Sequence, residues 1–113
     1  MSVGERATWN DVDQELRTLA DTGETFETEL SVTNRVGTYE AGRRISLVNP
    51  RGTSFVEIES IRECWTKLEK QGSIRRQDVL EPGRCSAFMM ALFGRVRGVR
   101  REQRDEPYLV LPK

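Results

Sequence analysis

The sequence predicts a small single domain of the α+β class. Its 113 residues are enough for one domain with one hydrophobic core, and 36% of them are hydrophobic while 32% are charged. Apolar residues recur at helical spacing in residues 8–21, alternate with polar residues from residue 25, and return to helical spacing from residue 57. These periods predict an N-terminal helix, a three- to four-stranded antiparallel meander, and two later helices.

The N-terminal helix is predicted over residues 8–21. Its apolar stripe consists of Trp9, Val12, Leu16, Leu19 and Ala20. Thr8 and Asp11 resemble a capping box, and Gly23 is a suitable stop. The other face of this helix is acidic.

The meander is predicted from alternation with a period of two, interrupted by turn residues. A turn is expected at Thr33-Asn34-Arg35, and a second at Asn49-Pro50-Arg51-Gly52, where Pro presets φ and Gly permits positive φ. The expected strands are 25–32, 36–40, 43–48 and 54–58.

The clearest helix in the sequence is predicted over residues 57–71. Ile58, Ile61, Trp65 and Leu68 share one face, and Gly72 follows its end. Charges of both signs alternate on the opposite face. This pattern is typical of a core helix with a solvated back.

A last helix is predicted over residues 85–93, which read CSAFMMALF. It is apolar on nearly every side, so it must be buried or docked against something. A basic arm or wing is expected over 95–107, and a closing strand over 108–111. The single domain would then comprise an N-terminal helix (1–23), a β meander (24–58), a two-helix unit (57–96), the basic segment and the closing strand.

The composition argues against several classes of protein. The chain has no histidine and only two cysteines, Cys64 and Cys85, which are far apart, so neither a zinc site nor another metal site is expected. No cofactor motif is found. No run of about 18 apolar residues is present, and the first ten residues contain no secretory h-region, so we expect a cytoplasmic protein that does not enter a membrane.

No motif in the sequence indicates catalysis. Without histidine, the usual general base near neutral pH is missing. Glu27, Glu29 and Glu40 could gather on one strand face and hold Mg²⁺, but a solvated polar face is the simpler interpretation. The glycines near residues 37 and 52 lack the spacing and lysine of a phosphate-binding loop. We therefore expect a protein that is not an enzyme.

The charge is zero overall but unevenly distributed. Residues 1–40 carry three basic and nine acidic side chains, whereas residues 41–113 carry fifteen basic and nine acidic ones. The segment 84–104 holds six arginines and only Glu102. Such asymmetry, with arginine as the main cation, indicates a polyanion-binding end.

The order of elements in residues 54–96 suggests which polyanion is bound. The helix over 57–71 is followed by a short Gly-Ser connector, then by Ile74-Arg75-Arg76-Gln77-Asp78, and then by the last helix. This layout resembles a helix-turn-helix or winged-helix DNA-binding domain. The resemblance implies contacts to bases or phosphates from the residues at the start of the second helix and from the basic segment, namely Arg75, Arg76, Gln77, Arg84, Arg95, Arg97, Arg100 and Arg101.

The sequence thus predicts a non-catalytic DNA-binding module, either a transcriptional regulator or the recognition subunit of a larger nucleic-acid-processing or defence complex. Nucleic acid, DNA rather than RNA, is the expected partner. One alternative is a protein-interaction or oligomerisation module that docks through the apolar helix 85–93, with a protein partner or as a homodimer. Another is an acidic mimic of nucleic acid, formed by Asp21, Glu24, Glu27 and Glu29. An ordinary solvated arginine-rich surface is the plain interpretation of the basic segment.

Overall fold

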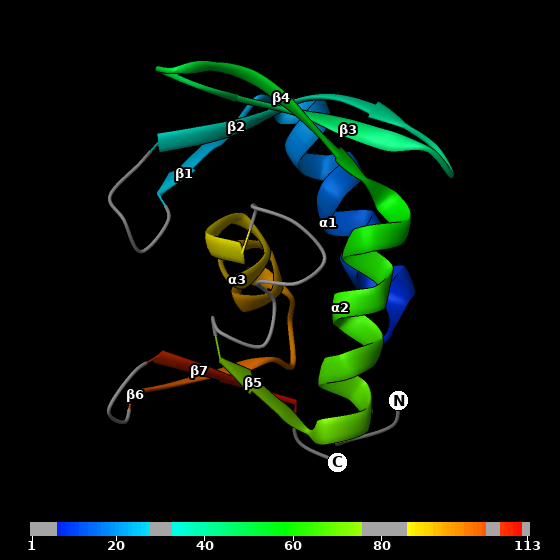
Figure 1. The fold of residues 1–113 in the computed structure, drawn as a ribbon, viewed down its shortest axis with the longest axis vertical. Coiled ribbons are helices and arrows are strands. Elements are labelled where there is room, and N and C mark those ends of the chain that lie inside the picture. The colour runs from blue at the N-terminus through cyan, green and yellow to red at the C-terminus, as the bar shows by residue number, and fades with distance from the viewer. Residues whose placement is uncertain (1–6, 28–32, 76–85, 104–106, 112–113) are drawn as a thin grey trace.

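The described residues of the chain form three helices and two antiparallel sheets, which confirms the predicted α+β class. The structure is a computed structural model, and it describes residues 7–27, 33–75, 86–103 and 107–111. Figure 1 shows the larger sheet at one end of the molecule, the smaller sheet at the other, and helix α3 between them. The elements are α1 (Trp9–Thr22), β1 (Thr25–Glu27), β2 (Thr33–Glu40), β3 (Arg44–Asn49), β4 (Gly52–Glu57), α2 (Ile58–Gln71), β5 (Ser73–Arg75), α3 (Ser86–Arg95), β6 (Arg100–Gln103) and β7 (Pro107–Val110).

Helix α1 has the caps that its sequence predicts. The backbone N–H of Thr8 donates to the Asp11 carboxylate over 2.7 Å, which forms one half of a capping box. The helix ends at Gly23, whose φ of 67° is the left-handed conformation that glycine adopts without strain. Its apolar stripe is buried through Val12, Leu16 and Leu19.

The larger sheet is a four-stranded meander in the order β1-β2-β3-β4. Its inner face buries Val36, Ile45, Leu47 and Val56. The predicted turn at Asn49-Pro50-Arg51-Gly52 is confirmed, because Asn49 pairs with Gly52 across it.

The turn predicted at Thr33-Asn34-Arg35 is wrong. These three residues begin β2 and pair in register with β1, so that Asn34 lies opposite Phe26. Asn34 is buried, and its side-chain oxygen accepts a hydrogen bond from the Asn49 side chain over 3.5 Å. Cross-strand pairing therefore overrides the local preference of Thr and Asn for turns.

Helix α2 matches its predicted span to within one residue. Ile58, Ile61, Trp65 and Leu68 are buried together with Cys64. The helix ends at Gly72, whose N–H donates to the Leu68 carbonyl over 2.7 Å. The Gly72 carbonyl accepts a hydrogen bond from the Leu111 N–H, which ties the end of α2 to the end of the described chain.

The smaller sheet is formed by β5, β7 and β6, in that spatial order. Its middle strand β7 corresponds to the predicted closing strand. The strands β5 and β6 were not predicted, because each is very short and contains arginine. They form because β7 pairs with both of them, Ile74 lying opposite Leu109 and Arg101 lying opposite the same residue on the other side.

Helix α3 is the central helix of the domain. Each residue from Phe88 to Phe93 is at most 5% exposed. The Phe88 ring lies 5.9 Å from that of Phe26 in β1, and the Phe93 ring lies edge-on to Trp65 of α2 at 5.4 Å. The apolar character of this helix is thus explained by burial within its own chain, and the side chains of Phe88–Phe93 present no open face to a partner. In the part of the chain that the structure describes, none of the helices is long and apolar enough to cross a membrane.

Candidate nucleic-acid interface

The predicted site residues fall into separate places in the fold. Arg76, Gln77 and Arg84 lie outside the described residues. The other five residues of the predicted site are described, and they are Arg75, Arg95, Arg97, Arg100 and Arg101.

Arg95 lies at the end of α3 and faces the N-terminal part of the chain. Its guanidinium pairs with Glu15 of α1 at 3.5 Å and also with Glu24, which precedes β1. It also lies above the Phe26 ring, 5.9 Å from the centroid. Arg95 therefore joins α3 to α1 and β1, and two carboxylates already balance its charge.

Arg75 and Arg100 lie on the outer face of the smaller sheet. In the strand register, Arg75 of β5 lies opposite Tyr108 of β7, and Tyr108 lies opposite Glu102 of β6. Residues directly opposite one another on antiparallel strands share a face of the sheet. Arg100 precedes Glu102 by two residues on β6, so it lies on the same face, and the two form an ion pair of 3.1 Å. This face carries two arginines, one tyrosine and one carboxylate.

Arg101 lies on the other face of the same strand. Successive residues of a strand point to opposite sides, and Arg101 is paired with the buried Leu109. Its guanidinium lies over Gly94 of α3, so closely that a Cβ at residue 94 would be 2.5 Å from Nε. Arg101 is nonetheless exposed to solvent as a whole.

Arg97 lies in the tight turn between α3 and β6. The turn is closed by a hydrogen bond of 3.1 Å from the Val99 N–H to the Val96 carbonyl, and Gly98 takes a φ of 98° that favours glycine. Arg97 is exposed. Within the described ranges, neither Arg97 nor Arg101 forms an ion pair.

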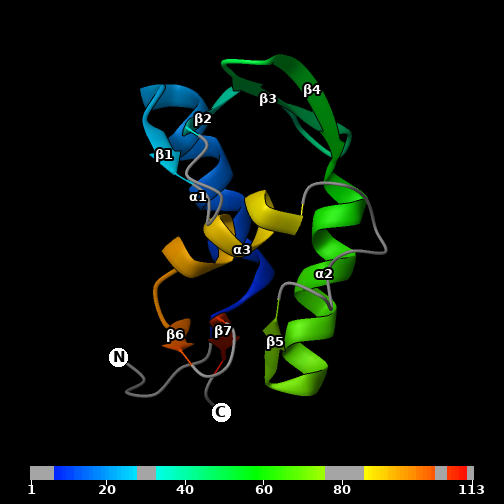
Figure 2. The same ribbon diagram turned by 60° about the vertical axis from the view of Figure 1, so that its left-hand side comes forward.

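These residues define what we call the basic hairpin: Arg97, Arg100 and Arg101 of the turn and β6, together with Arg75 of β5. They lie on the smaller sheet, at the end of the molecule opposite the meander (Figures 1 and 2). Glu102 is the only carboxylate among the described residues of β5, α3, β6 and β7. The side chain of Arg100 is 63% exposed, and an ion pair at the surface contributes little to stability, about 0–1 kcal/mol, so this arginine can exchange its carboxylate for a phosphate at low cost.

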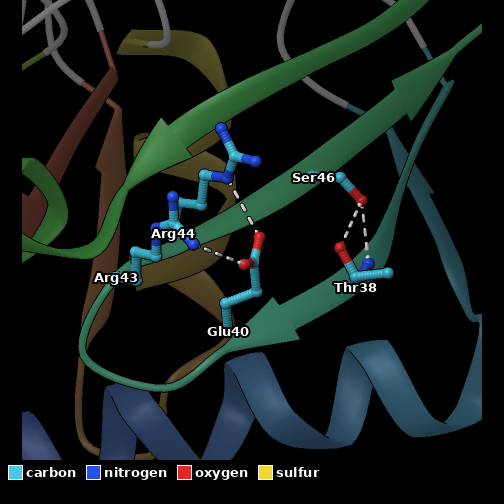
Figure 3. Close-up of polar contacts among 5 residues, drawn as sticks. All are labelled: Thr38, Glu40, Arg43, Arg44 and Ser46. Carbon is cyan, nitrogen blue, oxygen red and sulfur yellow. Dashed lines mark hydrogen bonds and ion pairs between the residues drawn. The ribbon is translucent and has the colours of Figure 1, made fainter.

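The meander carries a second group of arginines. The Glu40 carboxylate forms ion pairs with Arg44 at 2.9 Å and with Arg43 at 3.5 Å (Figure 3). The Ser46 hydroxyl accepts a hydrogen bond from the Thr38 N–H of the neighbouring strand. One carboxylate therefore holds both Arg43 and Arg44 on the meander.

Phe55 is a surface feature that sequence reasoning missed. It lies on the outer face of β4, is 55% exposed, and has the Arg44 guanidinium 4.1 Å above its ring. The strand pattern contained the necessary signal, because Phe55 alternates with the buried Val56 and therefore points to solvent.

The surroundings of Tyr39 and Cys64 raise the pKa values of both side chains. Burial, together with a hydrogen bond from its hydroxyl to Asp13, raises the pKa of Tyr39, and this contact fastens β2 to α1. Burial also raises the pKa of the Cys64 thiol to about 11. A buried thiol that keeps its proton is a packing residue and a poor nucleophile.

The acidic residues do not form a cluster that would hold a metal ion in the described part of the chain. Glu24, which belongs to the suggested acidic mimic, is paired with Arg95, and Glu29 lies outside the described residues. Comparison with models of protein families, with curated proteins and with solved structures finds no significant match. The function must therefore be argued from the geometry of this chain.

Proposed function

We propose that this protein is a non-catalytic DNA-binding module, a transcriptional regulator or the recognition subunit of a larger nucleic-acid-processing or defence complex. The order α2, β5, α3, β6, β7 carries the proposal, with β7 lying between β5 and β6 in the smaller sheet. Residues 54–96 resemble a winged-helix unit, in which a helix, a short strand and a further helix are followed by a β-hairpin that returns to the strand. Here β6 and β7 follow residue 96, and β7 pairs with β5.

The burial of α3 decides which part of such a unit would contact DNA. In a helix-turn-helix protein the second helix reads base edges in the major groove. Here Phe88 to Phe93 are covered by α1, α2 and the meander, so the middle of α3 offers no side chain to a groove. Arg97, Arg100 and Arg101 of the basic hairpin are exposed to solvent, and we assign the phosphate contacts to them.

The chemistry of the basic hairpin suits a phosphate backbone. Arginine presents a planar fork of N–H donors that fits a phosphate, and counterion release makes such contacts the main source of non-specific affinity. Arg97 and Arg101 form no ion pair with a described carboxylate, and Arg100 pairs with Glu102, whose side chain is 31% exposed. The surface predicts binding that depends weakly on base sequence and strongly on salt.

The proposal is tested with the double variant Arg97→Ala/Arg100→Ala. Binding to a labelled duplex of about 25 base pairs is measured by fluorescence anisotropy at two salt concentrations. The slope of log K against log salt is negative, and loss of two phosphate contacts should make it less steep by about 2. The same loss should weaken binding at least tenfold at low salt.

A matched control removes the same charge from the meander. Arg35 and Arg43 are both exposed, and replacing both with alanine should leave the affinity within about threefold, since only long-range attraction is lost. Equal losses in the two double variants would mean that the whole surface attracts DNA without a defined interface. Absence of binding by the wild-type chain at low salt would disprove the proposed function.

A further inference from the structure

The meander has one long free edge, which is strand β4. Among the described strands β4 pairs only with β3, through six successive residue pairs from Gly52 to Glu57 without a register shift. Proteins protect exposed edges with proline, lysine, a β-bulge or a very short strand. β4 has none of these protections, and the other edge strand, β1, has only three residues.

The side chains of β4 are exposed along most of this edge. Gly52, Thr53, Ser54 and Phe55 are all exposed, and only Val56 turns into the core. Within the described ranges, Phe55 is the one large hydrophobic side chain that is mainly exposed to solvent. Fully burying a phenylalanine is worth roughly 1.5–3 kcal/mol. Phe55 is 55% exposed and Arg44 already covers part of its ring, so a partner that covers the remainder would gain part of this free energy.

The charges at the two ends of the edge are complementary to each other. Arg51 precedes β4 and Glu57 ends it, and each lies three residues from Ser54. Both are exposed, and neither forms an ion pair with a described residue. If two copies of β4 pair antiparallel about Ser54, Arg51 of each copy lies opposite Glu57 of the other.

The same register brings the apolar side chains together. Phe55 of one copy lies opposite Thr53 of the other and diagonal to the second Phe55, and diagonal neighbours in a sheet are within reach of aromatic side chains. Arg51, Thr53, Phe55 and Glu57 lie on one face of the strand because they alternate with residues of the other face. A slip of one residue would lose both the charge pairs and the aromatic contact.

We propose that β4 is a self-association edge, and that its occupant is β4 of a second copy of this chain, paired antiparallel about Ser54. The two meanders would then form one continuous sheet with twofold symmetry. This inference rests on the edge strand and its charges alone, and it holds whether or not the basic hairpin binds DNA.

The register is tested by cysteine cross-linking of the full chain. Only the residue on the twofold axis faces its own copy, and opposite Cα atoms of antiparallel strands lie about 4.5–5.5 Å apart, within the range of a disulfide. Under mild oxidation, Ser54→Cys should give mostly covalent dimer. In Thr53→Cys the two introduced cysteines are diagonal to each other rather than opposite, so this variant should give no more covalent dimer than the wild-type chain. The wild-type chain serves as the background, because it contains the same two native cysteines.

The charge pairs are tested by sedimentation over a range of concentrations. Arg51→Glu places like charges opposite each other twice in the dimer and should raise its dissociation constant about tenfold or more. The double variant Arg51→Glu/Glu57→Arg restores opposite charges and should recover most of the wild-type affinity. Circular dichroism confirms that each variant is folded.

Either of two results would overturn the proposal. One is a wild-type chain that remains monomeric up to about 1 mM. At that concentration an association free energy near about 4 kcal/mol would be detected. The free edge of β4 would then be left for a strand of a different protein. The other is equal covalent dimer from Ser54→Cys and Thr53→Cys, which would exclude this register.

Discussion

At the scale of single residues, the element that carries each arginine decides which partner it meets. Arg95 ends α3 and turns to the carboxylates of Glu15 and Glu24. Arg100 and Arg101 are adjacent in sequence but lie on opposite faces of β6. The sequence identified this segment as basic, but it could not separate these roles, because the separation depends on where α1 and β7 pack.

Cys64 offers a test of the buried core by pH. Its side chain is fully buried in α2, and burial raises the pKa of the thiol from 9.0 to about 11. The folded state therefore keeps the thiol proton more tightly than the unfolded state does. This stabilisation is complete below pH 9 and is lost as the pH rises toward 11.

We expect the free energy of unfolding of the wild-type chain, relative to that of Cys64→Ala, to fall by about 2 kcal/mol between pH 7.5 and pH 10.5. Urea denaturation at the two pH values measures this difference, and the effects of Tyr39 and of the other cysteine cancel because both chains contain them. A difference that does not change with pH would show that the thiol is accessible to solvent in the folded state.

At the scale of elements, those with a regular local pattern were predicted from the sequence better than those that depend on pairing with a distant strand. Helix α2 was predicted to within one residue because its apolar stripe and terminal glycine are local signals. Strands β5 and β6 were missed because such short segments, with one apolar residue in β5 and none in β6, become strands only when β7 lies beside them. The same cause explains the wrong turn at residues 33–35, which pair with β1.

The β2–β3 pair also shows why a glycine stands at residue 37. The register shifts between Val36 and Tyr39, and a Cβ at Gly37 would lie 2.5 Å from the Ser46 hydroxyl and 3.2 Å from a Val48 methyl. The Ser46 hydroxyl is buried and accepts the Thr38 N–H over 2.8 Å, so it has no room to move.

Gly37→Ala should therefore destabilise the fold by about 1–3 kcal/mol, as overpacking commonly does. Gly94→Ala is the matched control, since its Cβ would also come within 2.5 Å of a neighbour. That neighbour is the end of the exposed Arg101 side chain, which can move away, and alanine is favoured in a helix by up to about 1 kcal/mol. Thermal denaturation compares the two variants, and an equal loss of stability in both would contradict the account of the β2–β3 contact.

At the scale of the whole molecule, the fold separates two surfaces. The meander lies at one end and the smaller sheet at the other, with α3 buried between them (Figures 1 and 2). The sequence predicted the α+β class and the core helices from periodicity alone. The shape of the candidate site was not predictable, because it depends on pairing across the sheet between Arg75, Tyr108 and Glu102.

The salt dependence of DNA binding tests the central claim most directly. Three arginines of the basic hairpin, Arg97, Arg100 and Arg101, are exposed to solvent, and each phosphate contact contributes about 0.9 to the slope of log K against log salt. Anisotropy titrations of the wild-type chain with a random duplex, from about 50 to 200 mM salt, should give a slope of roughly −2 to −3. A slope near zero, or no binding at the lowest salt, would contradict the assignment of the basic hairpin as a nucleic-acid interface.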